Sequence, residues 1–236
     1  MAEYQIRENI PEYMEELNKW LNSQENVMLE EMGDFFTVRI VDYEAHMELW
    51  EEGYRHIADL VPEKAESLLD LGCGTGLELD EILIKRPQLS VTGIDLCSAM
   101  LEKLKGKHPG VSTRCEDYFQ AEFGEEAFDC AVSFESLHHF LPENKQALYD
   151  KLYQSLKKGG VFLLVDYLAA CQEEEDLLMD FCWRKRREQG IPEGKFVHFD
   201  TPLTVEHEME LLKNAGFLKV EWLCAIEGAS FLRCEK

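Results

Sequence analysis

The stretch LLDLGCGTG at residues 68–76 constrains the fold more than any other part of the sequence. An apolar run is interrupted at Asp70, and glycines follow at positions 72, 74 and 76. A strand that passes through glycines into a helix brings backbone N–H groups and the positive helix end to one point, where side chains would block close approach. The stretch therefore predicts a nucleotide-like ligand at the carboxyl end of a strand.

The rest of the chain after Pro62 alternates between short apolar strands and helices. The predicted strands are 67–71, 89–95, 111–115, 128–134 and 160–167, and the predicted helices are 75–85, 98–107, 143–157 and 204–215. Successive β-α units of this kind predict an α/β fold with a parallel sheet and helices on both of its faces. Two last strands, 217–225 and 229–235, flank Glu227-Gly228, and such a short separation permits only an antiparallel hairpin.

Two segments lie outside this alternation. Residues 1–60 have helical spacing, with one apolar face formed by Tyr13, Met14, Leu17, Trp20 and Leu21 and another by Val41, Met47, Leu49, Trp50, Tyr54 and Ile57. Residues 170–203 form an insertion before the last helix, where they can cover the carboxyl ends of the strands. We therefore divide the chain into an N-terminal helical segment over the ligand site, 1–60, and a binding domain, 61–236, with an inserted cap at about 170–203.

Composition limits the classes of partner and compartment. With 47 acidic and 24 basic residues the net charge is −23, which repels nucleic acids and anionic membranes. The basic run WRKRRE at 183–188 is most simply a solvated helix face, with local anion binding as the alternative. Eight scattered cysteines without a CxxC pair indicate reduced core residues, so we predict no metal site. The first thirty residues have no signal-peptide pattern and no window has about 20 apolar residues, which predicts a cytoplasmic protein without a membrane span.

Acidic residues follow the next two strands. Asp95 ends the apolar run VTGID, 19 positions after Gly76, where an acid can bind both hydroxyls of a ribose. Glu116, Asp117 and Tyr118 end the third strand, where they can bind an exocyclic amine and flank a base. Each acid taken alone could be a helix cap or a turn residue. At consecutive strand ends after a glycine loop they favour a nucleoside, and the glycine spacing differs from the G-x-G-x-x-G of dinucleotide sites.

With these motifs the sequence resembles the class I S-adenosylmethionine (SAM)-dependent methyltransferases. LLDLGCGTG is similar to their first motif, VTGIDLCSAM to their ribose-binding second strand, and FDCAVSFESLHHF with LYDKLYQSLKKGGVFLLVDY to their fourth and fifth strands. The resemblance runs from about Phe35 to the C-terminus. It implies a three-layer Rossmann-like sheet of seven strands with the last antiparallel, and SAM as cofactor. FFTVRIVDYEAHM and FDTPLTVEHEMELLKNAGF further resemble a bacterial subgroup of small-molecule-type methyltransferases.

The resemblance also implies contacts for the cofactor. The methionine part would contact the glycine loop, and the ribose would contact Asp95. The adenosine would lie against hydrophobic residues, the adenine against the end of the third strand, and the sulfonium against the end of the fourth strand. The residues concerned are Asp70, Gly72, Gly74 and Gly76; Asp95; Leu96 and Met100; Glu116, Asp117 and Tyr118; and Phe134 and Glu135. Cys73 lies within the first motif, and we interpret it as packing. Arg39 and Tyr43, four apart on one helix, could close over the cofactor carboxylate, or could be a surface arginine and a core tyrosine.

Candidate catalytic groups follow the fourth strand. A nucleophilic oxygen or nitrogen can need a base, for which His138, His139 and Glu135 are the candidates, and His198 is a further one. The alternative for the histidines is packing or a backbone hydrogen bond. Substrate contacts are predicted at Asp166, Trp183, Phe196 and His198, which with Phe199 could form a lid or only the core of the insertion.

The sequence thus predicts a SAM-dependent methyltransferase that acts on an unidentified small molecule through an oxygen, nitrogen or sulfur atom, as a monomer or homodimer. A non-catalytic SAM-binding sensor and, less favoured, an NAD-dependent oxidoreductase are the alternatives. A carboxylated SAM derivative would instead need a cation facing the sulfonium, for which Arg184, Arg186 and Arg187 are the available sources.

Overall fold

The computed structural model of the chain describes residues 4–192 and 194–236. Glu193, within the predicted cap, lies outside the described residues. The strands are β1 (Ser67–Leu71), β2 (Ser90–Asp95), β3 (Ser112–Cys115), β4 (Phe128–Phe134), β5 (Leu156–Tyr167), β6 (Lys219–Ile226) and β7 (Ala229–Glu235). They form one sheet in the order β3-β2-β1-β4-β5-β7-β6, with β7 antiparallel to both of its neighbours. The predicted α/β sheet with a final antiparallel strand is confirmed.

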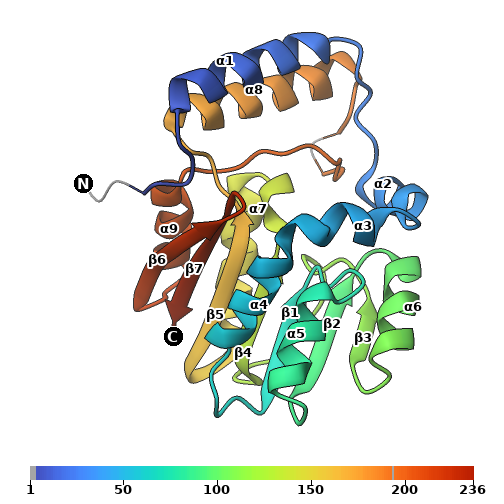
Figure 1. Ribbon diagram of the computed structural model, residues 1–236, viewed down its shortest axis with the longest axis vertical. Helices are drawn as coiled ribbons and strands as arrows, with labels where there is room; N and C mark the ends of the chain where they lie inside the picture. The colour runs from blue at the N-terminus through green and yellow to red at the C-terminus, as the bar shows by residue number, and fades with distance from the viewer. Residues whose placement is uncertain (1–3, 193) are drawn as a thin grey trace.

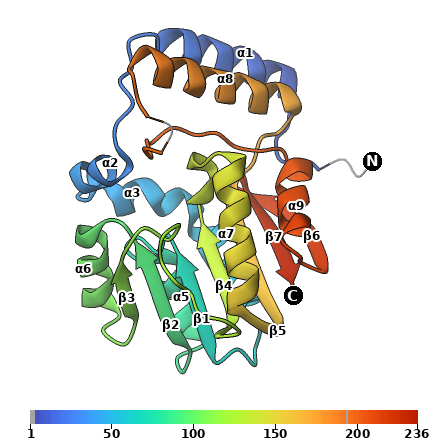
Figure 2. The ribbon, with the colours of Figure 1, turned by 180° about the vertical axis from the view of Figure 1, so that it is seen from behind.

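Helices cover both faces of this sheet (Figures 1 and 2). On one face lie α4 (Glu51–Leu60), α5 (Leu77–Lys85) and α6 (Ser98–Lys107), which share a buried apolar cluster with β1 and β4. On the other lie α7 (Pro142–Ser155) and α9 (Val205–Asn214), which pack on β4 and β5. Strands buried on both faces are therefore almost continuously apolar, as Leu68 to Leu71 and Val161 to Val165 are.

The N-terminal segment is not one long helix but a series of short ones. It comprises α1 (Ile10–Ser23), α2 (Met32–Arg39), α3 (Tyr43–Met47) and the 3-10 turn η1 (Glu48–Trp50) before α4. The predicted apolar faces were wrong at three positions, because Trp20, Val41 and Leu49 are 48%, 82% and 58% exposed. Val41 lies in the turn between α2 and α3 and Leu49 in η1, so neither keeps the helical phase assumed from the sequence.

The insertion forms α8 (Gln172–Glu188), which lies against α1 beyond the carboxyl ends of the parallel strands (Figures 1 and 2). The two helices enclose an apolar cluster formed by Leu21, Leu178, Phe181, Cys182 and Phe199. The extended segment after α8 returns between this helix pair and the sheet, and Glu31 pairs with Val197 in an isolated antiparallel bridge. Residues from both ends of the chain thus lie over the strand ends. None of the described helices is long and apolar enough to cross a membrane.

At the opposite end of the sheet, Asp129 ties β4 to β1. Its carboxylate accepts hydrogen bonds from the backbone N–H groups of Glu66 and Ser67 and lies 2.9 Å from the Lys157 ammonium. Partial burial raises the pKa of Asp129, but these donors outweigh it and lower the pKa to about 2. A depressed pKa adds stability that is present above the ordinary value near 4 and is lost as the pH falls towards 2.

We therefore expect Asp129→Asn to lower the urea midpoint of unfolding more at pH 6 than at pH 3. Parallel urea titrations of both proteins, followed by circular dichroism, check this. An equal decrease of the midpoint at the two pH values would show that the negative charge of Asp129 does not stabilise the fold.

Candidate functional site

The glycine loop after β1 is tightly enclosed by its own neighbours. Gly72, Gly74 and Gly76 all have positive φ angles, of 75°, 46° and 76°. A Cβ atom on Gly72 would overlap the Ser136 hydroxyl, and one on Gly76 would overlap a methyl group of Leu104. Side chains are therefore excluded at 72 and 76 by packing, while Gly74 faces Tyr43 and Met100 at contact distance.

Asp95 holds this loop from the end of β2. One carboxylate oxygen accepts from the Gly74 N–H at 2.9 Å, and the other accepts from the Cys97 N–H at 2.7 Å. Burial raises the pKa of Asp95, and the two backbone donors oppose that rise. Each oxygen can accept a second hydrogen bond, so the carboxylate remains able to bind a diol.

Asp70 is completely buried beneath the loop beside the Glu78 carboxyl group, and no N–H donor among the described residues lies within hydrogen-bond distance of its carboxylate. Burial and the neighbouring Glu78 raise its pKa well above the ordinary value, and burial raises that of Glu78 to about 7. A buried acceptor without a donor is costly, so a cationic group bound beside the loop would be stabilised here.

A narrow cavity of about 60 Å³ lies against the loop. Of the residues predicted to contact the cofactor, it is lined by Tyr43, Gly72, Gly74, Asp95, Leu96, Met100, Tyr118, Phe134 and Glu135. It is also lined by residues that sequence reasoning did not select: Met32, Gly33, Phe36, Cys97, Ser136, His139 and Phe140.

The remaining predicted cofactor residues are not among the described residues that line this cavity. Glu116 forms a surface ion pair with Arg114, and Asp117 accepts from the Phe119 N–H at 2.8 Å. Cys73 is buried, with its sulfur beside Gly93 of β2. Arg39 stacks on the Phe35 ring at 3.7 Å and pairs with Glu30, and it lies on α2 whereas Tyr43 begins α3.

A second cavity, of about 610 Å³, adjoins the first. The two cavities have four lining residues in common: Phe36, Tyr43, Glu135 and His139. The larger one is also bordered by aromatic and basic side chains from the N-terminal segment, by His198 and Asp200 of the insertion, and by Glu227 and Gly228 of the β6–β7 hairpin. A molecule in it would therefore touch whatever occupies the narrow cavity.

Glu135 stands at the junction in a strained conformation. It follows β4 with a φ of 48°, unusual for a residue with a side chain, and its N–H donates to the Val165 carbonyl at 2.8 Å. One carboxylate oxygen is buried without a hydrogen-bond partner. Burial raises the pKa of Glu135 to about 8, although the nearby His138 opposes that rise.

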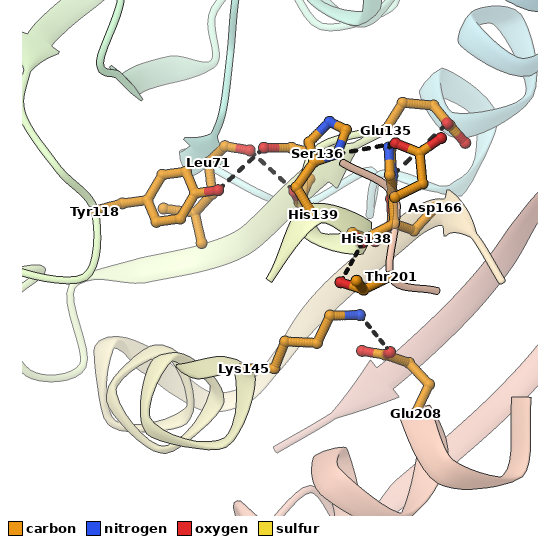
Figure 3. A network of polar contacts seen from close by, with 12 residues as sticks. Leu71, Tyr118, Glu135, Ser136, His138, His139, Lys145, Asp166, Thr201 and Glu208 are labelled. Carbon is orange, nitrogen blue, oxygen red and sulfur yellow. Dashed lines mark hydrogen bonds and ion pairs between the residues drawn. The ribbon is translucent and has the colours of Figure 1, made fainter. Parts of the chain in front are cut away.

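Two histidines, His138 and His139, lie on the turn η2 (Leu137–His139), close to Asp166 of β5 (Figure 3). Both also lie within 4 Å of an Asp200 oxygen. His138 Nδ1 lies 2.6 Å from an Asp166 oxygen, and His139 Nδ1 lies 3.1 Å from Asp200. Burial lowers the pKa of His138, but Asp166, Asp200 and Glu135 outweigh it and raise the pKa to about 9. Burial and His138 lower the pKa of His139, and burial lowers that of His198 to about 3.

The four predicted substrate residues separate into two pairs. His198 lines the larger cavity, and its ring stacks on Phe35 at 3.4 Å. Asp166 pairs with His138, which lines the same cavity. Trp183 lies beside Arg186, and Phe196 packs on Phe119 and Phe140. Neither Trp183 nor Phe196 is among the described residues that line either cavity.

Asp200 is the functional candidate that sequence reasoning missed. It lies two residues after His198 in an extended segment, a spacing that places two side chains on one side of the backbone. The Thr201 N–H donates to the His138 carbonyl at 2.7 Å and fixes this segment against η2. The pattern His-x-Asp was the available signal, but its approach to η2 depends on the path of the insertion.

Comparison with known proteins agrees with this geometry. A family model described as "Methyltransferase domain" matches residues 68–160. The carboxy-S-adenosyl-L-methionine synthase of Nautilia profundicola is 26% identical over 167 residues, which are 66% of this chain and 71% of that protein.

Among solved structures, Streptomyces venezuelae DesVI superposes with a TM-score of 0.62 at 18% identity, over 84% of this chain and 96% of that one. Human N-acetylserotonin methyltransferase in complex with SAM superposes with a TM-score of 0.60 at 18% identity, over 82% of this chain and 54% of that one. The chain thus spans about half the length of the human enzyme. These likenesses show a shared fold, and with the match over residues 68–160 they identify a class I SAM-dependent methyltransferase domain in this chain.

Proposed function

We propose that the protein transfers a methyl group from SAM to a small-molecule acceptor held in the larger cavity. The observation that carries this proposal is the shared lining of the two cavities by Phe36, Tyr43, Glu135 and His139. Direct methyl transfer needs the acceptor atom, the methyl carbon and the sulfur in line within one water-poor space. Two adjoining cavities with a common wall supply such a space.

In this proposal SAM occupies the narrow cavity and widens it by displacing the side chains that face the loop. Its ribose diol binds Asp95, its adenosine lies against Leu96, Met100 and Tyr118, and its cationic amino group is drawn towards the buried Asp70. The N-terminal segment, residues 1–60, covers the cofactor through Phe36 and Tyr43. The cap, at about 170–203, closes the acceptor side through His198 and Asp200.

The reaction is a displacement at carbon. An electron pair of the acceptor atom forms the new bond to the methyl carbon, the carbon–sulfur bond breaks with its pair on sulfur, and S-adenosylhomocysteine (SAH) remains. A proton lost by the acceptor must pass to a base, and Glu135, His138 and His139 are the candidates within the shared wall or beside it. We favour Glu135, because its unpartnered oxygen lies where the two cavities meet.

We expect Glu135→Gln to bind SAH as the parent does, within about threefold, and to lower the rate of methyl transfer by about 100-fold or more, the usual contribution of a positioned base. The measurement combines SAH calorimetry with incubation of CD3-labelled SAM and a metabolite extract, in which mass spectrometry finds the labelled compound. Glu221→Gln, on the exposed surface of β6, is the matched control. Equal labelling by both variants would remove Glu135 from the reaction.

The same experiment separates the other functions. A protein that binds SAH but labels no compound behaves as a SAM sensor, and one stabilised by NAD rather than SAM or SAH in a thermal-shift series is an oxidoreductase. A carboxylated derivative would be visible by mass spectrometry of the co-purified ligand. For that derivative the cations proposed from the sequence lie elsewhere: Arg184 and Arg187 line a hollow between α1 and α8, and Arg186 donates to the carbonyls of Pro192 and Lys195.

A further inference from the structure

The cluster of His138, His139 and Asp200 has the donor set of a metal centre. Its imidazole nitrogens and carboxylate oxygen come from two parts of the chain, the turn η2 and the inserted segment, and the three ligand atoms lie within 4.8 Å of one another. Two histidines and one carboxylate on one side of an ion are a recurrent site for divalent transition metals, with the other coordination positions left open.

The distances between these ligand atoms are short enough for all three to approach one ion. Asp200 Oδ1 lies 3.1 Å from His139 Nδ1 and 3.7 Å from His138 Nε2. Metal bonds of about 2.1 Å place adjacent ligand atoms about 3.0 to 3.4 Å apart, depending on geometry. Asp200 is the polar partner of His139 Nδ1, and no other described residue makes a hydrogen bond to that nitrogen.

The opposite nitrogen of His138 is already engaged. Nδ1 lies 2.6 Å from Asp166, a completely buried carboxylate on β5, so Nε2 is the nitrogen that faces Asp200. A carboxylate that binds the far nitrogen of a metal-bound histidine fixes its ring and tautomer. A competing set of Glu135, His138 and Asp166 would require this same Nδ1, and is therefore less suitable.

Charge also favours a cation in this place. Glu135, Asp166 and Asp200 surround the two histidines within one cluster (Figure 3 shows Glu135, Asp166 and both histidines). Neither arginine that lines the larger cavity forms an ion pair with these carboxylates: Arg39 pairs with Glu30, and Arg7 lies over the Tyr13 ring at 4.5 Å, although its charge lowers the pKa of Glu135. A divalent ion would neutralise carboxylates that those arginines leave unpaired.

We propose that His138 Nε2, His139 Nδ1 and Asp200 Oδ1 bind a divalent transition-metal ion whose open positions face the larger cavity. The ion joins the cap to the end of β4. If the protein transfers methyl groups as proposed above, the ion also selects the acceptor: a molecule with a hydroxyl and a neighbouring oxygen, both able to bind the metal, whose hydroxyl proton the metal makes easier to remove.

Metal titration of the full chain tests the binding site without any methyl transfer. After treatment with EDTA and its removal, we expect the protein to bind one equivalent of Zn²⁺ by calorimetry, and one of Co²⁺ with a visible absorption band. We expect Asp200→Asn to weaken Co²⁺ binding by about 100-fold or more, and Asp166→Asn to weaken it by about 10- to 100-fold through the orientation of His138.

His207→Gln is the matched control. His207 also pairs with a carboxylate, that of Glu175, but it lies on α9, outside the proposed metal site. It should bind Co²⁺ as the parent does, and circular dichroism should show that every variant is folded. No Co²⁺ or Zn²⁺ binding by the folded parent, or equal binding by Asp200→Asn and the parent, would overturn the site.

The acceptor class has its own test. Acetohydroxamate, which offers two adjacent oxygens, should change the visible band of the Co²⁺-loaded parent. An unchanged band with saturating acetohydroxamate would overturn the open coordination positions while leaving the metal site in place. Because these readouts involve no SAM, they succeed or fail independently of the methyltransferase activity.

Discussion

Replacing Asp95 by alanine is expected to raise the dissociation constant for SAH by about 100-fold or more. If Asp95 binds the ribose diol as proposed, the substitution removes two charge-assisted hydrogen bonds, each contributing about 1.5–3 kcal/mol. Their sum of at least about 3 kcal/mol corresponds to more than a hundredfold in affinity. The variant also frees the Gly74 and Cys97 N–H groups, which loosens the loop against which the cofactor lies.

Calorimetric titration with SAH measures this effect, and two further variants sharpen it. Asp95→Asn keeps the shape and an acceptor oxygen but loses the charge, so its affinity should lie between those of the parent and the alanine variant. Asp150→Ala, on the exposed face of α7, should bind as the parent does. Unchanged SAH affinity in Asp95→Ala would remove the ribose assignment.

Replacing Lys145 by methionine is expected to lower the free energy of unfolding by about 3–5 kcal/mol, the usual cost of leaving a buried charge without its partner. Lys145 of α7 and Glu208 of α9 are both fully buried, with 2.7 Å between ammonium and carboxylate. The Tyr149 hydroxyl also donates to Glu208. Without the ammonium, Glu208 must be protonated or hydrated, and both disrupt the contact between the two helices.

Urea unfolding at pH 7, followed by circular dichroism, measures this loss. Because the cost arises from the unpaired carboxylate, a triple variant, Lys145→Met, Glu208→Leu and Tyr149→Phe, should recover most of the stability. Lys219→Met, which breaks an exposed pair with Glu221, should leave the midpoint unchanged. A triple variant no more stable than the single one would show that packing around the lysine chain, rather than charge, determines the effect.

The central strands could be predicted from sequence because β1, β4 and β5 are largely buried on both faces. Runs such as SLLDL and FDCAVSF have the boundaries found in the structure, since the change from apolar to glycine or polar residues coincides with the end of each strand. The N-terminal helices were harder to predict. Trp20, Val41 and Leu49 continue an apolar pattern by composition but are exposed, and at Val41 and Leu49 the cause is a turn that shifts the helical phase.

The residues of the candidate site also differ in how well the sequence predicts them. Asp95 and Tyr118 follow strands whose positions fix them at one edge, so sequence alone places them beside the glycine loop. Asp200 and Phe36 reach the cavities through the folding back of segments that have no periodic signal, and their contacts are long-range. Trp183 and Phe196 show the converse, because their aromatic character suggested a lid, whereas Trp183 lies beside Arg186 and Phe196 packs on Phe119 and Phe140.

The pairing of α1 with α8 has a consequence for how the chain acquires its structure during synthesis. The first helix leaves the ribosome early, but its partner is encoded near the end of the chain, and contacts such as Leu29 N–H to the Gln189 side chain join residues 160 positions apart. Until α8 emerges, Leu21 and the rest of the apolar side of α1 stay without their partners. The cover over the strand ends therefore assembles only after about three quarters of the chain has been made, and a nascent chain stalled before α8 would leave the candidate site open.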